Sequence, residues 1–371
     1  MKFNPNYRIT PKLTRQLLEI ERHKEAFSVL PITATLISSL RETARLLSTH
    51  YSTQIEGNSL TPKEVAQVAK GKQGFSGRER DEREVRNYFS ALEYIEKALN
   101  NKTPFSEKLI QTTHGLVLTG SKRATPYREG QNVIRDGATG SIVYMPPEAH
   151  DVIPLMKELT TWTIAQINEK ELPPPILAGL VHYQFATIHP YYDGNGRTAR
   201  LLTTFVLHQM SYGMKGIYSL EEYYAKNLQG YYEALSIGKS HNYYGGRVEA
   251  DITPFLDYFL EGMGTSFRSV RQQAERMQQI ENPVTDQAEK LRELRPRQRQ
   301  ILSLFAKQKE VSIQEIATHL EINSRNAYTL IQKWIGQGFV QIENPSKKAR
   351  TYGLALEWEG LVRKNNLELD R

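Results

Sequence analysis

The stretch TIHPYYDGNGRTAR, residues 187–200, gathers residue types that bind phosphate. Its centre is a short glycine-flanked loop made of Gly194, Asn195 and Gly196. Backbone N–H groups of such a loop at the start of a helix converge on an anion, and the helix dipole adds to the attraction. Arg197 and Arg200 follow one helical turn apart, so both guanidinium groups reach one polyphosphate from the same face. The stretch therefore predicts a polyphosphate site.

Two further residues of this stretch suit chemistry on a bound phosphate. Asp193 offers a hard oxygen ligand beside the loop, which suits Mg²⁺ held by one carboxylate and by phosphate oxygens. His189 lies before the loop, where its imidazole can accept a proton from an attacking hydroxyl group. These residues predict phosphoryl transfer with a histidine base and a magnesium ion.

The elements that must position these residues are two helices. The apolar segment ILAGLVHYQFATI follows three prolines, as expected at a helix start, and predicts a central core helix. That helix should end at His189, because the residue before a proline is pushed out of the α region. RTARLLTTFVLHQM then restarts an apolar helical pattern. The site is therefore expected between two core helices.

The remaining pattern is mostly helical, with one convincing break. Between residues 127 and 150, the short β-prone runs QNVI and SIVYM lie on either side of turn-forming residues. They predict a β-hairpin that Pro146 and Pro147 end. The expected fold class is therefore mainly α with one small hairpin.

The C-terminal part has its own pattern. Residues 266–293 are rich in Gln, Glu and Arg, which indicates a linker. The segments RPRQRQILSLFAKQ, SIQEIATHL and SRNAYTLIQKWIGQG then predict three helices, and FVQIENPSKKARTYGLAL predicts a two-stranded wing. This order resembles a winged helix-turn-helix domain over residues 294–371.

Such a domain has two classes of partner. In the DNA-binding interpretation, one set of residues faces a groove and another meets phosphate. The groove set is Arg325, Asn326, Tyr328 and Thr329, and the phosphate set is Lys347, Lys348 and Arg350. In the other interpretation the domain binds a target protein or a second copy of the chain, because winged helices also bind proteins. The sequence does not decide between DNA and protein as the partner of this domain. It also leaves open whether the chain forms a homodimer.

Composition limits the setting of the protein. The 371 residues are 39% hydrophobic and 24% charged, which is ordinary for a globular chain with more than one domain. The net charge of +7 favours anionic partners such as nucleotides or nucleic acid. The absence of cysteine excludes disulfides and thiolate metal sites. No apolar run approaches a membrane span of roughly 20 residues, so we expect a cytoplasmic protein with no membrane partner.

The segment HPYYDGNGRTAR resembles the signature of the Fic family, HPFxxGNGRxxR, with Tyr191 where phenylalanine is usual. The resemblance implies a helical core with a hairpin called the flap, and transfer of AMP from ATP onto a hydroxyl side chain of a target protein. It also implies the roles of the signature residues. These are His189 as base, Asp193 as Mg²⁺ ligand, Gly194, Asn195 and Gly196 as phosphate cradle, and Arg197 and Arg200 as polyphosphate clamps.

The flap and the base-binding residues are less specific. The flap, residues 130–146, would hold a target segment as an added strand, although a hairpin that only caps the core is the alternative. Downstream, EEYYAKNLQGYYEAL resembles family segments that place an Asn and a Tyr against adenine, here Asn227 and Tyr231. An aromatic stripe at helical spacing is also typical of core packing.

A second short motif bears on control. STQIEGN, from residue 52 onward, places Ser52 and Glu56 on one helix face before a helix-ending Gly57. On its own this is a capped helix, but it resembles the inhibitory motif [S/T]xxxE[G/N] of Fic proteins. That likeness implies that Glu56 pairs with Arg200 at the place of the γ-phosphate, so that ATP binds unproductively.

These patterns predict four regions. They are an N-terminal helical region, 1–105, with the inhibitory motif at 52–57; a Fic core, 106–265, with the signature at 189–200; the linker, 266–293; and the winged helix, 294–371. The expected function is an autoinhibited adenylyltransferase that modifies a Ser, Thr or Tyr of a target protein and of itself. The alternatives are a DNA-binding regulator that senses nucleotides, and a Fic enzyme that mainly removes AMP.

Overall fold

The computed structural model describes residues 3–71, 74–135, 139–238, 241–281, 290–344, 346, 350–355 and 357–362. The chain divides into two compact units, Met1–Glu275 and Arg276–Arg371. The expectation of a mainly helical fold with small sheets is confirmed, and no helix in the described ranges is long and apolar enough to cross a membrane.

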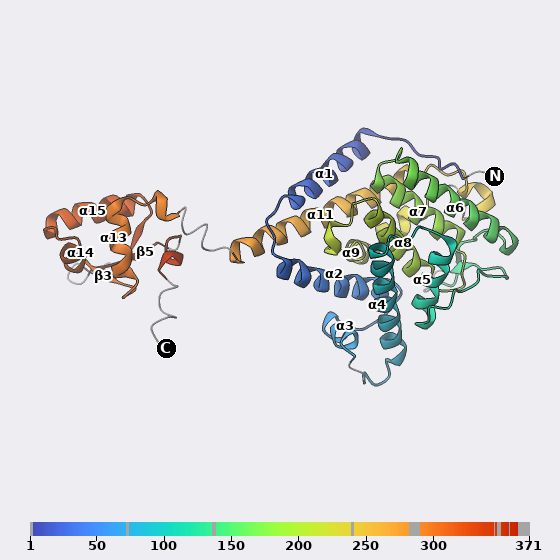
Figure 1. Ribbon diagram of the computed structural model, residues 1–371, viewed down its shortest axis with the longest axis horizontal. Helices are drawn as coiled ribbons and strands as arrows, with labels where there is room; N and C mark the ends of the chain where they lie inside the picture. Colours follow the sequence, from blue (N-terminus) through green and yellow to red (C-terminus); the bar gives the residue numbers. More distant parts are fainter. Residues whose placement is uncertain are drawn as a thin grey trace. The chain divides into compact units, whose positions relative to one another are not determined.

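The first unit is a helical assembly with one hairpin (Figure 1). Before the hairpin lie α1 (Pro11–Ser28), α2 (Ala34–Ile55), α3 (Pro62–Ala69), α4 (Glu79–Asn100) and α5 (Glu107–Thr119). After it come α6 (Ala149–Glu169), α7 (Pro174–Ile188), α8 (Asn195–Gln209), α9 (Glu221–Lys226), α10 (Leu228–Leu235) and α11 (Thr253–Glu281).

The centre of this unit is α7, which packs against α6 and α8. Proline occupies its first turn, and its side chains are apolar on all faces and almost all buried. The helix ends at His189, which adopts a left-handed conformation with φ 51° and precedes Pro190. Gly194, also left-handed with φ 78°, then begins α8. Two core helices therefore fix both ends of the loop that carries the signature.

The hairpin consists of β1 (Ile134–Arg135) and β2 (Ile142–Tyr144), paired antiparallel. It lies within the predicted flap, although Asp136, Gly137 and Ala138 are outside the described residues. The Tyr144 hydroxyl donates to the Thr187 carbonyl oxygen at 2.7 Å, which ties the flap to the last turn of α7.

One expected boundary differs from the structure. The linker was expected to begin at 266, but α11 continues to Glu281, and Phe267, Val270 and Ala274 are buried within the first unit. These three residues recur at helical spacing and form an apolar face. The exposed face of the same helix is rich in Gln, Glu and Arg, so the overall composition of the segment resembles that of a linker.

The second unit has its own core, centred on Ile301, Ile331 and Tyr352. Its helices are α13 (Pro296–Phe305), α14 (Ile313–His319) and α15 (Ser324–Gly336). Its strands are β3 (Val311–Ser312), β4 (Val340–Asn344) and β5 (Thr351–Leu354), in the order β3-β5-β4. The predicted third helix and wing fall on α15 and on β4 with β5, while Lys347 and Lys348 lie outside the described residues. The winged-helix assignment itself stays a prediction.

Candidate active site between α7 and α8

The loop between α7 and α8 is braced by its own side chains. Asn195 is 3% exposed, and its amide bonds both backbone groups of Tyr191: Oδ1 accepts from the N–H at 3.0 Å and Nδ2 donates to the carbonyl at 2.8 Å. The Gly194 N–H donates to Asp193 Oδ1 at 2.6 Å. The Asn195 side chain therefore holds the loop closed. Its predicted role in binding phosphate is additional to this structural role.

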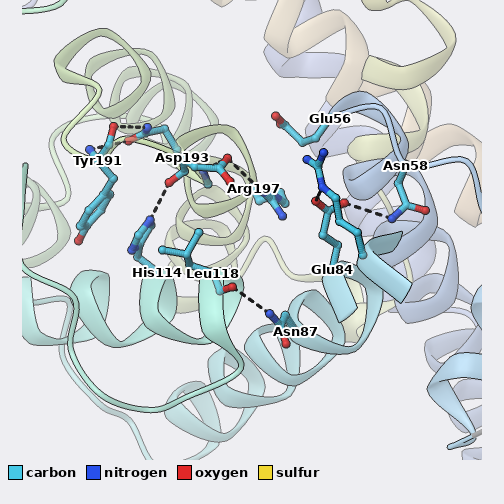
Figure 2. A network of polar contacts seen from close by, with 12 residues as sticks. Glu56, Asn58, Glu84, Asn87, His114, Leu118, Tyr191, Asp193 and Arg197 are labelled. Atoms are coloured by element: carbon cyan, nitrogen blue, oxygen red, sulfur yellow. Dashed lines mark hydrogen bonds and ion pairs between the residues drawn. The ribbon is translucent and has the colours of Figure 1, made fainter. Parts of the chain in front are cut away.

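Arg197 pairs with an acid of the same loop. Its Nη2 lies 3.0 Å from Asp193 Oδ1, with the arginine side chain 3% exposed and the aspartate side chain 60% exposed. Burial of Arg197 under an exposed carboxylate leaves Asp193 accessible to a ligand from solvent. Figure 2 shows this pair beside His114.

Arg200 pairs with the end of α2. Its Nε donates to Ser52 Oγ at 2.8 Å, and its Nη2 donates to the Ser52 carbonyl at 2.9 Å and to Glu56 Oε1 at 2.8 Å. Burial disfavours the charged guanidinium, but the Glu56 carboxylate outweighs this and raises the pKa of Arg200 above its ordinary value. Ser52 and Arg200 are thus buried together, and the partly exposed carboxylate of Glu56 completes this cluster.

The Glu56 carboxylate lies over the start of α8. A Cβ atom placed on Gly196 would come within 2.5 Å of Glu56 Oε1 and within 3.1 Å of Arg200 Nη1. The backbone N–H groups at the start of a helix attract anions. The carboxylate therefore lies where the predicted phosphate cradle would receive a phosphate oxygen.

His189 lies at the junction of α7 and the loop. Its Nδ1 faces the Ala186 carbonyl oxygen at 3.4 Å, so a neutral ring places its proton on Nδ1 and leaves Nε2 as an acceptor. Burial lowers the pKa of His189 from 6.5 to about 4, and the positive charge of Arg128 acts in the same direction. The imidazole is therefore neutral at pH 7, as a general base must be.

A cavity of about 630 Å³ joins these groups. Its walls come from the flap, from the end of α7, from the start of α8, from α10 and from Glu56 at the end of α2. His189, Asn195, Gly196 and Arg200 line it. A volume of this size fits a nucleotide-sized ligand.

The two residues predicted to bind the base, Asn227 and Tyr231, line different pockets. Tyr231 lines the cavity and is 2% exposed, and its hydroxyl lies 2.8 Å from His182 Nε2. Asn227 is exposed and lines a separate pocket between α2, α9 and α11. Because α9 ends and α10 begins at Asn227, its side chain does not share the face of Tyr231.

Arg128 is a site residue that sequence reasoning missed. Its Nε donates to the His189 carbonyl at 3.0 Å, its Nη1 to the Gly130 carbonyl at 3.0 Å, and its Nη2 to the Pro147 carbonyl. This one buried guanidinium therefore ties both ends of the flap to the backbone of His189. A single arginine ahead of a hairpin has no local pattern that reveals such a role.

His114 of α5 was also missed. Its Nε2–H donates to the Asp193 carbonyl at 2.8 Å, and its ring stacks on Tyr191 with centroids 3.5 Å apart (Figure 2). Burial lowers the pKa of His114 to about 4, so the ring is neutral at pH 7. Tyr191, at the position where phenylalanine is usual, thus supports the loop through this stack.

The chain after α2 is held by α4. The Asn58 side chain donates to the Asp81 carbonyl at 3.0 Å and to Glu84 Oε2 at 3.2 Å (Figure 2). The backbone N–H and the hydroxyl of Ser59 donate to Asp81 Oδ2 at 3.0 and 2.6 Å. These bonds fix the turn that follows Glu56, so that the carboxylate stays above α8.

A magnesium ion fits this site only with help from a ligand. No group of three or more His, Asp or Glu side chains that could hold a metal occurs in the described part of the chain. Asp193 is a single accessible carboxylate next to the loop, and Mg²⁺ often takes one or two carboxylates together with phosphate oxygens and water. The donor set therefore agrees with a metal that arrives with a nucleotide.

The class of domain is therefore a helical fold in which two core helices hold a glycine-flanked loop next to a β-hairpin. Comparison with known families gives its name: the Fic/DOC family matches residues 104–207, and the chain therefore carries a Fic/DOC domain.

Curated relatives match a wider segment. The chain is 28% identical over 199 residues to the protein adenylyltransferase Fic of Drosophila virilis, which covers 53% of this chain and 40% of that relative. The same identity and coverage hold for the protein of that name from Drosophila grimshawi. The chain thus spans well under half of the length of these relatives.

Solved structures support the fold. A Fic family protein from Desulfovibrio desulfuricans G20 matches 95% of this chain and 98% of its own, with 23% identity and a TM-score of 0.59. A Fic domain containing signaling protein from Bacteroides thetaiotaomicron VPI-5482 matches 70% of this chain and 97% of its own, with the same identity and TM-score.

Proposed function

We propose that the chain is a protein adenylyltransferase, which transfers AMP from ATP to a Ser, Thr or Tyr hydroxyl of a target protein. The observation that carries this proposal is the neutral His189 at the edge of a cavity that also contains the start of α8 and Arg200, with Nε2 unbonded within the described part of the chain. The curated relatives, which are named protein adenylyltransferases, support the same reaction.

The reaction follows from the roles of these groups. His189 Nε2 accepts the hydroxyl proton, the oxygen forms a bond to the α-phosphorus, and the bond to pyrophosphate breaks. The loop N–H groups, Arg197 and Arg200 bind the departing pyrophosphate, and a magnesium ion beside Asp193 would neutralise its charge. Most of the catalysis is positioning and electrostatic stabilisation.

Labelled ATP tests the reaction. We expect the label of α-³²P-ATP to appear on protein and the label of γ-³²P-ATP to stay in solution. Transfer of the γ-label would instead indicate phosphate transfer and contradict the proposal. The chain itself and a lysate of candidate targets serve as acceptors, since the proposal includes modification of the enzyme's own hydroxyls.

We also propose that the enzyme is autoinhibited by Glu56. The carboxylate pairs with Arg200 and occupies the space above Gly196, so a triphosphate would have to bind with its end displaced. Displacement moves the α-phosphorus away from the line of attack of the hydroxyl. The alternative, in which Glu56 orients a water that removes AMP from a modified target, uses the same carboxylate as a base.

The flap is the proposed docking site for the target. Its strand β2 has Ile142 42% exposed, and Met145 just beyond the strand is 37% exposed. An extended target segment paired with this edge would present a hydroxyl to His189 while little of its sequence is read. Arg128 connects both ends of the flap to His189, which would keep acceptor and base aligned.

The second unit is the basis of a second candidate function, a DNA-binding regulator. α15 exposes Arg325, Asn326, Tyr328 and Thr329 on one face, as a helix that enters a DNA groove would. If this helix binds duplex DNA, the full chain should bind with an affinity that falls steeply as salt rises, and Arg325→Ala should weaken binding. Absence of any duplex binding at low salt would leave a protein partner as the role of this unit.

A further inference from the structure

Arg247 is a buried arginine that lines the site cavity, and it has no acidic partner among the residues that the structure describes. It is 4% exposed, and none of the ion pairs in the described part of the chain includes it. An uncompensated buried charge is costly, so such a group either serves the fold through other contacts or awaits a ligand. Of the other buried arginines at the site, Arg197 and Arg200 each pair with a carboxylate, whereas Arg128 donates to three backbone carbonyls.

The contacts of Arg247 within the protein use only part of its capacity. Its Nη1 donates to the Leu235 carbonyl at the end of α10, and its guanidinium lies over the Tyr144 ring at 5.0 Å. Nε has no hydrogen-bond partner among the described residues. A guanidinium has five N–H donors, so donors remain for a molecule in the cavity.

The backbone holds Arg247 against the flap. It ends a tight turn, Tyr243–Arg247, and the segment before this turn pairs with the end of β2: the Met145 N–H donates to the His241 carbonyl at 2.7 Å and the Tyr243 N–H donates to the Met145 carbonyl at 3.0 Å. Tyr144 and Arg247 therefore form one wall of the cavity.

This wall lies away from the phosphate end of the cavity. At the phosphate end, the Tyr232 hydroxyl of α10 contacts the Ile55 carbonyl, next to Glu56. Leu235, one turn further along α10, contacts Arg247 instead. A nucleotide with its terminal phosphates at Arg200 and its α-phosphate at His189 would extend its nucleoside toward Arg247.

We propose that Arg247 binds the nucleoside part of the nucleotide, donating hydrogen bonds to oxygen or nitrogen acceptors of the base or ribose. Tyr144 and Tyr231, which line the same cavity, offer aromatic surface to the base. This role replaces the one that the sequence suggests for Asn227, which lines a different pocket. The inference rests on the proposed nucleotide site.

The test compares two ligands that share the phosphate chain but not the nucleoside: ATP and inorganic tripolyphosphate, titrated with the full chain by calorimetry. Arg247→Met keeps much of the side-chain volume and removes the donors. We expect the affinity for ATP to fall about 10-fold, because hydrogen bonds from a charged donor are lost, and the affinity for tripolyphosphate to stay within about 2-fold. Arg200→Ala should weaken both ligands.

Arg135→Met is the matched control, since Arg135 lines the same cavity but is exposed. An equal loss for ATP in both methionine variants, an equal loss for both ligands in Arg247→Met, or no loss at all would overturn the inference. Arg247→Lys retains the charge without the planar fork and serves if Arg247→Met does not fold; unchanged affinity for ATP in the lysine variant would also contradict it. Failure of the wild-type chain to bind either ligand would instead contradict the proposed nucleotide site.

Discussion

The signature segment, residues 189–200, and the end of α2 each supply a carboxylate to an arginine of α8. In the signature, Asp193 pairs with Arg197 four residues later, and the aspartate side chain is 60% exposed. At the end of α2, Glu56 pairs with Arg200 across 144 residues of sequence, and the glutamate side chain is 28% exposed. One pair belongs to a single helix start, whereas the other joins two elements.

This difference distinguishes an ion pair that belongs to the local fold of the loop from an ion pair that can be removed without changing the loop. The Asp193–Arg197 pair is local, because Asp193 directly precedes the N-cap Gly194 and Arg197 lies in the first turn of α8. The Glu56–Arg200 pair depends on how α2 packs against α8, and its glutamate lies in the cavity. The comparison therefore predicts that changes in the signature lower activity, while a change at the end of α2 raises it.

The largest expected effect is at His189. His189→Ala should lower transfer of the α-label by about 1,000-fold, since general base catalysis contributes factors of 10² to 10⁴. Binding of ATP should persist, because the proposed phosphate contacts are made by other residues. Undiminished labelling by a folded His189→Ala protein would contradict the mechanism.

The next effect tests the removable pair. Glu56→Gly should raise labelling by about 100-fold, because misplacement of a reacting group by about 1 Å costs on that order. Initial rates at saturating ATP measure the gain. Arg200→Ala should lose activity. The double variant should resemble Arg200→Ala, because it lacks the guanidinium that the loss of Glu56 would otherwise release to bind the triphosphate.

One control variant and two further outcomes sharpen this experiment. Glu56→Gln keeps the packing and removes the charge, so it should also activate, by a smaller factor. If Glu56→Gly binds ATP and folds normally yet labels no faster than the wild type, the end of α2 is only a capped helix. Slower removal of AMP from a modified target in this variant would identify Glu56 as a hydrolytic residue.

The signature segment could be recognised from the sequence because its residues are contiguous. Proline and glycine mark where α7 ends and α8 begins, and the polar residues between them fall within one short stretch. The same local logic located the hairpin and the mainly helical class of fold. Local spacing therefore suffices where one segment of chain builds the feature.

The parts that were missed join distant segments. Arg128 reaches His189 across 61 residues, and His114 reaches Asp193 across 79. Which residues meet across such separations is decided by the packing of helices, which a single sequence does not display. Asn227 shows the complementary difficulty, because helical spacing cannot reveal that the helix breaks at this residue. Its role in base binding stays a prediction.

A moderate effect is expected at the carboxylate of the local pair. Asp193→Ala should reduce labelling about 10-fold and flatten the dependence on Mg²⁺, because the ion would lose its protein ligand. Asp193→Asn keeps an oxygen and should retain more activity. A magnesium titration of each variant measures this, and a curve identical to that of the wild type would remove Asp193 from the metal site.

A smaller effect tests the tie between flap and base. Arg128→Met should lower the rate several-fold with little change in the affinity for ATP. Arg128 positions the His189 backbone, and its hydrogen bonds in the described part of the chain do not reach the proposed phosphate-binding residues. Its charge also lowers the pKa of His189, so the acid limb of the activity profile should move to higher pH in this variant. A purely structural role would lower the rate without moving that limb.

The smallest effect concerns pH near neutrality. Because burial lowers the pKa of His189 to about 4, the base is already neutral at pH 6, and the rate on a fixed substrate should change by less than about 2-fold between pH 6 and 8. The rate should fall only below about pH 5. A profile with its midpoint near the ordinary histidine value of about 6.5 would show that the buried, neutral His189 is wrong.

Unfolding must be separated from this titration. Burial also lowers the pKa values of His182 and His208, to about 3 and about 4. Between these values and about 6.5 the unfolded chain binds more protons than the folded one, so the free energy of unfolding should decrease as the pH falls through this window. Denaturation by urea at pH 7 and pH 5 measures this loss. The acid limb of activity therefore has to be measured at temperatures where both the wild type and Arg128→Met are still folded at pH 4. A limb that coincides with unfolding in either protein would not assign the titration to His189.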